Sequence, residues 1–168
     1  MKEKSLTQYM LVNQVLISGL SNMLINGLIA VLIKRQSDAI RFFGENGVAA
    51  GLVVMAFLLP LILTVINSKN VERGIKAGKL FFGVTQYKNI VGFIAQKPYW
   101  LIGLSLGCLM AIMIGLVLLF IQSDISYLVL DVAQYGLLVG SIAGLIAACT
   151  SPITAFLVMV RYSRVQPN

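Results

Sequence analysis

The chain has 168 residues, of which 58% are hydrophobic and only 11% are charged, and its mean hydropathy is +0.90. Soluble domains carry roughly 25% charged residues, so this composition excludes a soluble enzyme. The sequence has no histidine, which excludes a histidine-ligated haem or metal and a histidine-based triad, and with only two cysteines we expect neither a zinc site nor a cofactor.

The charged residues are grouped, and the gaps between the groups predict membrane-crossing helices. Four uncharged stretches have 29, 23, 26 and 29 residues. A bilayer core takes about 20 helical residues, so each stretch fits one crossing and none fits two. The sequence therefore predicts an all-α integral membrane protein, with one domain over 1–168. Its four transmembrane helices are expected at about 9–33, 48–66, 99–121 and 133–160, arranged as two antiparallel hairpins.

The distribution of lysine and arginine predicts the orientation of the chain. With four crossings, the N-terminus, the 67–98 loop and the C-terminus share one side, and ten of the 13 cations fall there. The other three are Lys34, Arg35 and Arg41. Because the Lys/Arg-rich side faces the cytoplasm, we expect cytoplasmic N- and C-termini in a multi-pass protein of the cell inner (plasma) membrane. The net charge of +7 is then a topology signal and does not indicate nucleic-acid binding.

The first predicted helix carries a polar stripe. Gln14, Ser18, Asn22 and Asn26 recur every four residues and therefore share one face. Such a face is costly against lipid. It forms either hydrogen bonds to other helices, in this chain or in a partner, or the lining of a polar pathway or a headgroup site. The spacing leaves both interpretations open.

The second and fourth predicted helices each contain a proline, Pro60 and Pro152. Proline removes a backbone donor and frees the carbonyl four residues earlier, so both positions are predicted helix breaks. Matched breaks in two halves of a chain are typical of transporter sites. A shift of 92 residues superposes the two prolines but few other residues, so we do not predict a sequence repeat.

The segments NMLINGLIA (22–30) and AFLLPLILTVI (56–66) form a recognisable pattern. Together they resemble uncharacterised small bacterial inner-membrane proteins with four helices, in which an Asn-rich first helix precedes an AFLLP-type second helix. The resemblance covers the first two helices, about 60 residues. It implies a bacterial integral membrane protein and carries no activity or functional residues with it.

The 67–98 segment is predicted to be a cytoplasmic interfacial loop. Val71, Ile75, Gly78 and Phe82 follow helical spacing, and the segment is basic and rich in aromatic residues. Such segments lie in the headgroup layer. Anionic lipid headgroups are accordingly the expected contacts of Lys69, Arg73, Lys76, Lys79 and Lys88. Docking of a partner protein is the alternative.

Small residues recur every four positions in the last two predicted helices. The third carries Gly103, Gly107, Ala111 and Gly115, and the fourth carries Gly136, Gly140, Gly144 and Ala148. Such stripes let helix backbones approach closely in lipid. We expect these two grooves to pack the third and fourth helices against each other. A seam between subunits is the alternative.

The predicted spans contain no acidic or basic residue, so no general acid–base pair exists in the membrane and we expect no catalytic residues. Two classes of function remain. One is an accessory, assembly or self-associating protein that docks a larger membrane protein or its own copies. The other is a small transporter-like, channel-like or lipid-binding protein for a neutral or zwitterionic ligand. The first is favoured, because four helices barely suffice to enclose a cavity.

Overall fold

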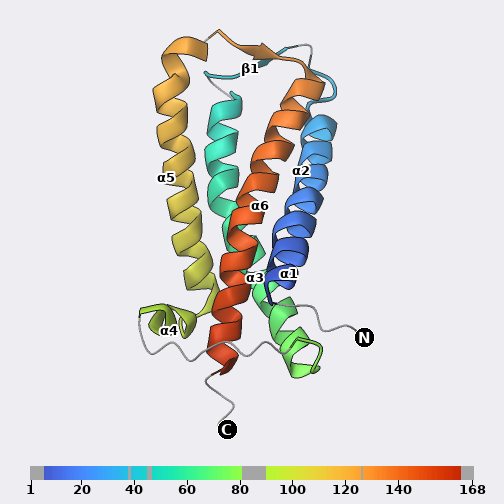
Figure 1. Ribbon diagram of the computed structural model, residues 1–168. Helices are drawn as coiled ribbons and strands as arrows, with labels where there is room; N and C mark the ends of the chain where they lie inside the picture. The colour runs from blue at the N-terminus through green and yellow to red at the C-terminus, as the bar shows by residue number, and fades with distance from the viewer. Residues whose placement is uncertain (1–5, 38, 45–46, 81–89, 126, 164–168) are drawn as a thin grey trace.

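The computed structural model describes residues 6–37, 39–44, 47–80, 90–125 and 127–163. Four long helical segments run side by side (Figure 1). The first joins three elements, α1 (Leu6–Gln8), the π-helix η1 (Tyr9–Ile17) and α2 (Ser18–Lys34). The others are α3 (Val48–Lys76), α5 (Tyr99–Ile125) and α6 (Val132–Ser163), and the short α4 (Ile90–Ala95) precedes α5. All four segments are long and apolar enough to cross a membrane, so the chain is a multi-pass, mostly helical membrane protein.

The last helix, α6, is the centre of the bundle. It packs against α2 on one side and α3 on the other, and α5 packs on α3. In its most apolar stretch 56% of the residues are buried, against 11–22% in the other three helices. Most of the large apolar side chains of α2 and α5 are exposed, as a lipid environment allows.

The glycines of α5 pack against α3, and not against α6 as the stripes had led us to expect. A Cβ at Gly107 would collide with the Phe57 carbonyl oxygen, and one at Gly103 would lie 3.0 Å from the Leu61 Cα. Gly115 faces open space. The prediction of close helix packing is confirmed at Gly103 and Gly107, but the predicted partner helix is wrong, because α5 packs against α3.

The glycines of α6 pack against α2. A Cβ at Gly140 would lie 2.6 Å from the Met23 carbonyl oxygen, and one at Gly144 would lie 3.0 Å from the Gly19 carbonyl oxygen. Gly136 follows the same line, facing Gly27 and Val31. The two backbones approach closely over about three turns because glycines of both helices face the contact.

Two short strands close one end of the bundle. In an antiparallel pair, β1 (Ile40–Arg41) joins β2 (Val129–Leu130), with Ile40 opposite Leu130. Both residues are buried in an apolar cluster with Phe42 and Leu118. Beside them, the Asp131 carboxylate accepts a hydrogen bond from the Gln134 backbone N–H (2.8 Å), and the Gln134 side chain accepts one from the Asp131 N–H (3.1 Å). This reciprocal capping pair fixes the start of α6.

The second span was predicted to end at residue 66, but α3 continues through Lys76. Val71, expected in an interfacial loop, is 1% exposed and packs with Tyr9 and Val158. The 67–98 loop is therefore wrong over its first ten residues. The helix ends at a glycine cap, where Gly78 has a φ of 66° and its N–H bonds the Ile75 carbonyl oxygen, and not at the first charge.

Both prolines lie inside continuous helices, so the predicted breaks are wrong. Pro60 is within α3 and Pro152 is within α6. Each removes one donor from the hydrogen-bond ladder, and packing in the bundle holds the rest of the helix together. Contacts at Thr64–Thr154 and Glu72–Tyr162 both span 90 residues, so α3 and α6 run parallel and in register.

Candidate functional site

The π-helical turns of η1 place two polar side chains on one face. In a π-helix the backbone bond joins residues five apart, so side chains at that spacing project in similar directions. Tyr9 and Gln14 are five apart and both are buried, and the Gln14 Nε2 donates to the Tyr9 hydroxyl at 2.8 Å. Gln14 is the most buried residue of the predicted stripe.

A hydrogen-bond network links η1, α3 and α6 at the level of Gln14. The Asn67 Nδ2 donates to the Gln14 Oε1 (2.8 Å) and to the Ser151 carbonyl oxygen (3.0 Å). One turn along, the hydroxyls of Ser18 and Ser151 lie 2.6 Å apart. The first half of the polar stripe is therefore used inside the bundle. Asn67 was not among the predicted residues, because the spans were drawn to end at residue 66.

The second half of the stripe is arranged differently. The Asn22 Nδ2 donates to the Ser18 carbonyl oxygen and the Asn26 Nδ2 donates to the Asn22 carbonyl oxygen, both at 2.9 Å and both within α2. Both side chains are half-buried at the edge of the α2–α6 contact. Within the described part of the chain, neither side-chain oxygen accepts a hydrogen bond. Each amide thus retains an acceptor and one donor hydrogen in the span.

Hydroxyl groups line the contact between α3 and α6. Thr64 and Thr154 face each other at 3.4 Å, and the Thr154 hydroxyl donates to the Thr150 carbonyl oxygen (2.9 Å). The hydroxyls of Ser68 and Thr150 are fully buried and have no partner among the described residues. This row was not predicted, although buried residues recur on α3 with the same four-residue spacing as in the other stripes.

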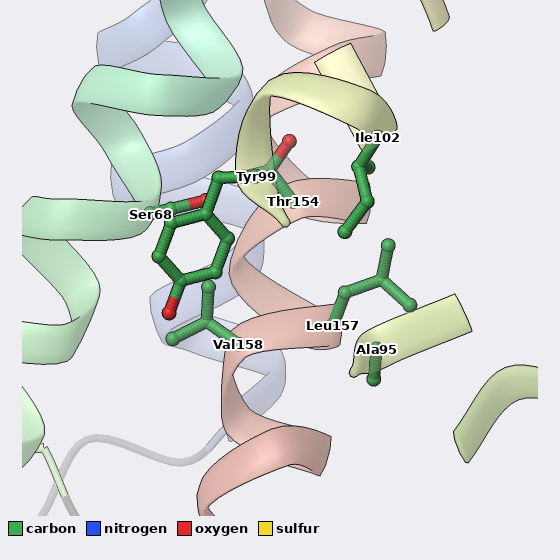
Figure 2. A pocket seen from close by; sticks show the side chains of 7 residues that line it. All are labelled: Ser68, Ala95, Tyr99, Ile102, Thr154, Leu157 and Val158. Atoms are coloured by element: carbon green, nitrogen blue, oxygen red, sulfur yellow. The ribbon is translucent and has the colours of Figure 1, made fainter. Parts of the chain in front are cut away.

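Next to this row, α3, α4, α5 and α6 leave a small pocket, shown in Figure 2. Ser68 and Thr154 contribute its hydroxyl groups, Tyr99 contributes an aromatic side chain, and the rest of the lining is aliphatic. The side chains close in so far that a water molecule does not fit. In this conformation the pocket holds no ligand-sized space.

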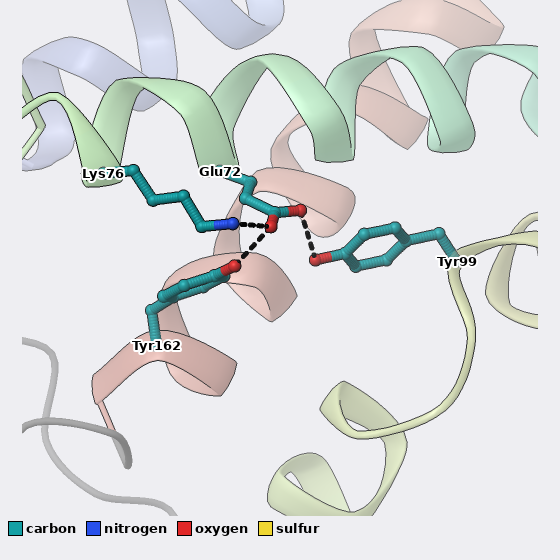
Figure 3. A network of polar contacts seen from close by, with 4 residues as sticks. All are labelled: Glu72, Lys76, Tyr99 and Tyr162. Atoms are coloured by element: carbon teal, nitrogen blue, oxygen red, sulfur yellow. Dashed lines mark hydrogen bonds and ion pairs between the residues drawn. The ribbon is translucent and has the colours of Figure 1, made fainter.

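Glu72 joins three helices at the end of the bundle where α6 ends (Figure 3). Its carboxylate accepts hydrogen bonds from the Lys76 Nζ (2.6 Å), the Tyr162 hydroxyl (2.5 Å) and the Tyr99 hydroxyl (3.3 Å). The Arg161 guanidinium lies 4.7 Å from the centre of the Tyr99 ring. We call these five residues the Glu72 cluster. The Lys76 ammonium and the two tyrosine hydroxyls donate hydrogen bonds to the carboxylate, so Glu72 connects α3, α5 and α6.

The predicted lipid-contacting cations divide into three groups. Lys69, Arg73 and Lys79 are exposed on the last turns of α3 and just beyond. Lys76 is also exposed but is paired with Glu72. Lys88 and Phe82 lie outside the described residues.

Metal ligands and cysteines are the remaining candidate groups of the described chain. Among its residues no three Cys, Asp or Glu side chains come close enough to hold a metal ion. Cys108 and Cys149 are both exposed and form no disulfide. Comparisons of the chain with protein-family models, with curated proteins and with solved structures found no match. The similarity of the first two helices to small bacterial inner-membrane proteins therefore stays a prediction.

Proposed function

We propose that this protein is a non-enzymatic inner-membrane protein that self-associates through one edge of α2. In this proposal both termini face the cytoplasm. The cations Lys69, Arg73 and Arg161 lie at the end of the bundle where the last helix ends, and Lys34 and Arg35 lie at the other. Counted over the whole chain, the ten-to-three ratio of cations supports this orientation.

The observation that carries the proposal is the state of the Asn22 and Asn26 amides. Both sit in an uncharged span at the edge of a helix contact, with unused side-chain oxygens. Polar groups that remain unsatisfied in a bilayer are costly, and interhelical hydrogen bonds of Asn drive helix association there. A transmembrane helix that covered this edge would remove that cost.

A second copy of the chain suits this edge better than an unrelated helix. Each amide keeps one acceptor and one donor hydrogen, so two copies related by a two-fold axis can form reciprocal amide pairs. The flanking side chains Ile25, Ile29 and Ile33 are exposed and supply apolar contact beside the amides. A larger membrane-protein partner is the alternative occupant of the same edge.

The mass of the purified protein in lipid nanodiscs or mild detergent tests this proposal. The chain has a mass of 18.3 kDa, and we expect native mass spectrometry to detect twice that value. The double variant Asn22→Leu/Asn26→Leu should shift the distribution to the monomer. The matched control is Ser105→Leu on α5, because Ser105 is exposed but already bonded to its own helix at the Leu101 carbonyl oxygen. A wild-type protein that stays monomeric overturns self-association.

A second candidate function is passage of a small neutral or zwitterionic molecule between α3 and α6. One observation favours it: among the described residues the buried hydroxyls of Ser68 and Thr150, between α3 and α6, have no partner, and these two helices contain Pro60 and Pro152. Matched prolines beside polar groups are typical of transport sites. The closed pocket at Ser68 weighs against this candidate in the present conformation.

Cysteine labelling separates the two candidates. On a background without Cys108 and Cys149, the variants Thr64→Cys, Ser68→Cys and Thr150→Cys are exposed to a water-soluble maleimide. A water-filled pathway between α3 and α6 predicts labelling at all three positions. Protection at all three, with labelling of an exposed control such as Lys69→Cys, contradicts the pathway and agrees with a dry helix contact.

A further inference from the structure

The short helix α4 lies across the end of the bundle, where α6 ends, and not alongside the long helices (Figure 1). One side of it is buried, since Ala95 packs with Leu157 and Val160 of α6. The other side is apolar and exposed, with Ile90 at 76% and Phe93 at 62%. Close to α4, at the start of α5, Trp100 is 57% exposed.

Positive charge accompanies this apolar surface. The Lys97 ammonium lies 4.1 Å from the centre of the Phe93 ring. The Arg161 guanidinium donates to the carbonyl oxygens of Gln96 (2.8 Å) and Lys97 (3.4 Å), so it holds the end of α4 against α6. The sequence from residue 90 to residue 100 contains no Asp or Glu.

We propose that α4, Lys97 and Trp100 form a site that seats in the headgroup layer of an anionic leaflet. A helix lying in the membrane plane buries its apolar side at the boundary of headgroups and acyl chains, and tryptophan is enriched at this depth. Lysine beside such a surface attracts anionic lipid phosphates. The inference rests on the proposed four crossings, and it assigns the lipid contact to different residues from the five cations predicted on sequence.

The test uses the single tryptophan of the chain. The full-length protein is reconstituted into phosphatidylcholine vesicles containing lipids brominated either near the carbonyl groups or near the chain ends. Trp100 fluorescence should be quenched most by the shallow bromines. The depth control is Leu116→Trp on a Trp100→Phe background, because Leu116 is exposed further along α5. That tryptophan should be quenched most by the deep bromines.

Charge selectivity is measured by carrying the shallow bromines on phosphatidylglycerol or on phosphatidylcholine at equal content. The lipid around Trp100 should be up to about fivefold richer in phosphatidylglycerol than the bulk, as one interfacial cation provides. Lys97→Gln should remove this preference and leave the quenching depth unchanged.

Three outcomes contradict parts of this picture separately. If neither tryptophan is quenched, the four-crossing proposal fails. If only Trp100 emits as in water and is unquenched, the crossings stand and the α4 site is overturned. Equal quenching by both headgroups, unchanged in Lys97→Gln, overturns the anionic site.

Discussion

The side-chain amide of Asn67 on α3 donates a 2.8 Å hydrogen bond to the Gln14 side-chain oxygen on η1. The same nitrogen donates to the Ser151 carbonyl oxygen on α6, so three helices meet at one amide. Gln14 reaches this position because the π-helical turns bring it onto the face of Tyr9. The polar residues at this depth therefore join η1, α3 and α6 by hydrogen bonds.

Asn67→Ala should lower the free energy of unfolding by roughly 1–3 kcal/mol, because it leaves the buried Gln14 oxygen without a donor. Unfolding in mixed micelles of mild and denaturing detergent measures this change. Asn70→Ala is the matched control, since Asn70 is exposed on the same helix. If the two variants unfold alike, the network does not stabilise the fold.

Gly140→Ala should destabilise the protein by about 1–3 kcal/mol through overpacking. Its Cβ would lie 2.6 Å from the Met23 carbonyl oxygen, a backbone atom that cannot move without shifting α2. Gly115→Ala meets no atom within 4 Å, so it should be neutral or raise stability by up to about 1 kcal/mol. Thermal unfolding of the two variants in one detergent compares them. Equal stability would contradict the α2–α6 contact.

Glu72→Ala should loosen the end of the bundle where α6 ends, because Tyr162 and Tyr99 lose their common acceptor. We expect amide hydrogen exchange in the last turn of α6 to accelerate several-fold, while exchange in the first turn of α6 stays unchanged. Asp124→Ala, at an exposed acid near the opposite end, should leave this exchange unchanged. Unaltered exchange in Glu72→Ala would show that the Glu72 cluster does not stabilise this end.

The sequence predicts the number of long apolar helices well, because hydrophobic length and charge spacing are local properties. It predicts their contacts poorly. The stripes of Gly107 and Gly140 indicate close helix approach, but a small-residue face does not identify the helix that fills it. Whether α5 leans on α6 or on α3 depends on the whole arrangement of the bundle.

The candidate site was predicted in part for the same reason. The four-residue spacing identified Gln14, Ser18, Asn22 and Asn26. Only the structure shows that the first two side chains bond other helices, whereas the last two bond carbonyl oxygens of α2 itself. Asn67 was not predicted because the second predicted span ends at residue 66, shortly before the first charged residue, Lys69. The π-helix has no signature that hydrophobic periodicity reveals.

Disulfide crosslinking in native membranes tests the central claim, that the Asn22–Asn26 edge of α2 faces a second copy. On a background lacking Cys108 and Cys149, Asn26→Cys should form a covalent dimer under mild oxidation. Leu24→Cys should not, because Leu24 is 64% exposed and points away from that edge. A monomer in both variants, or equal crosslinking of both, would contradict the claim.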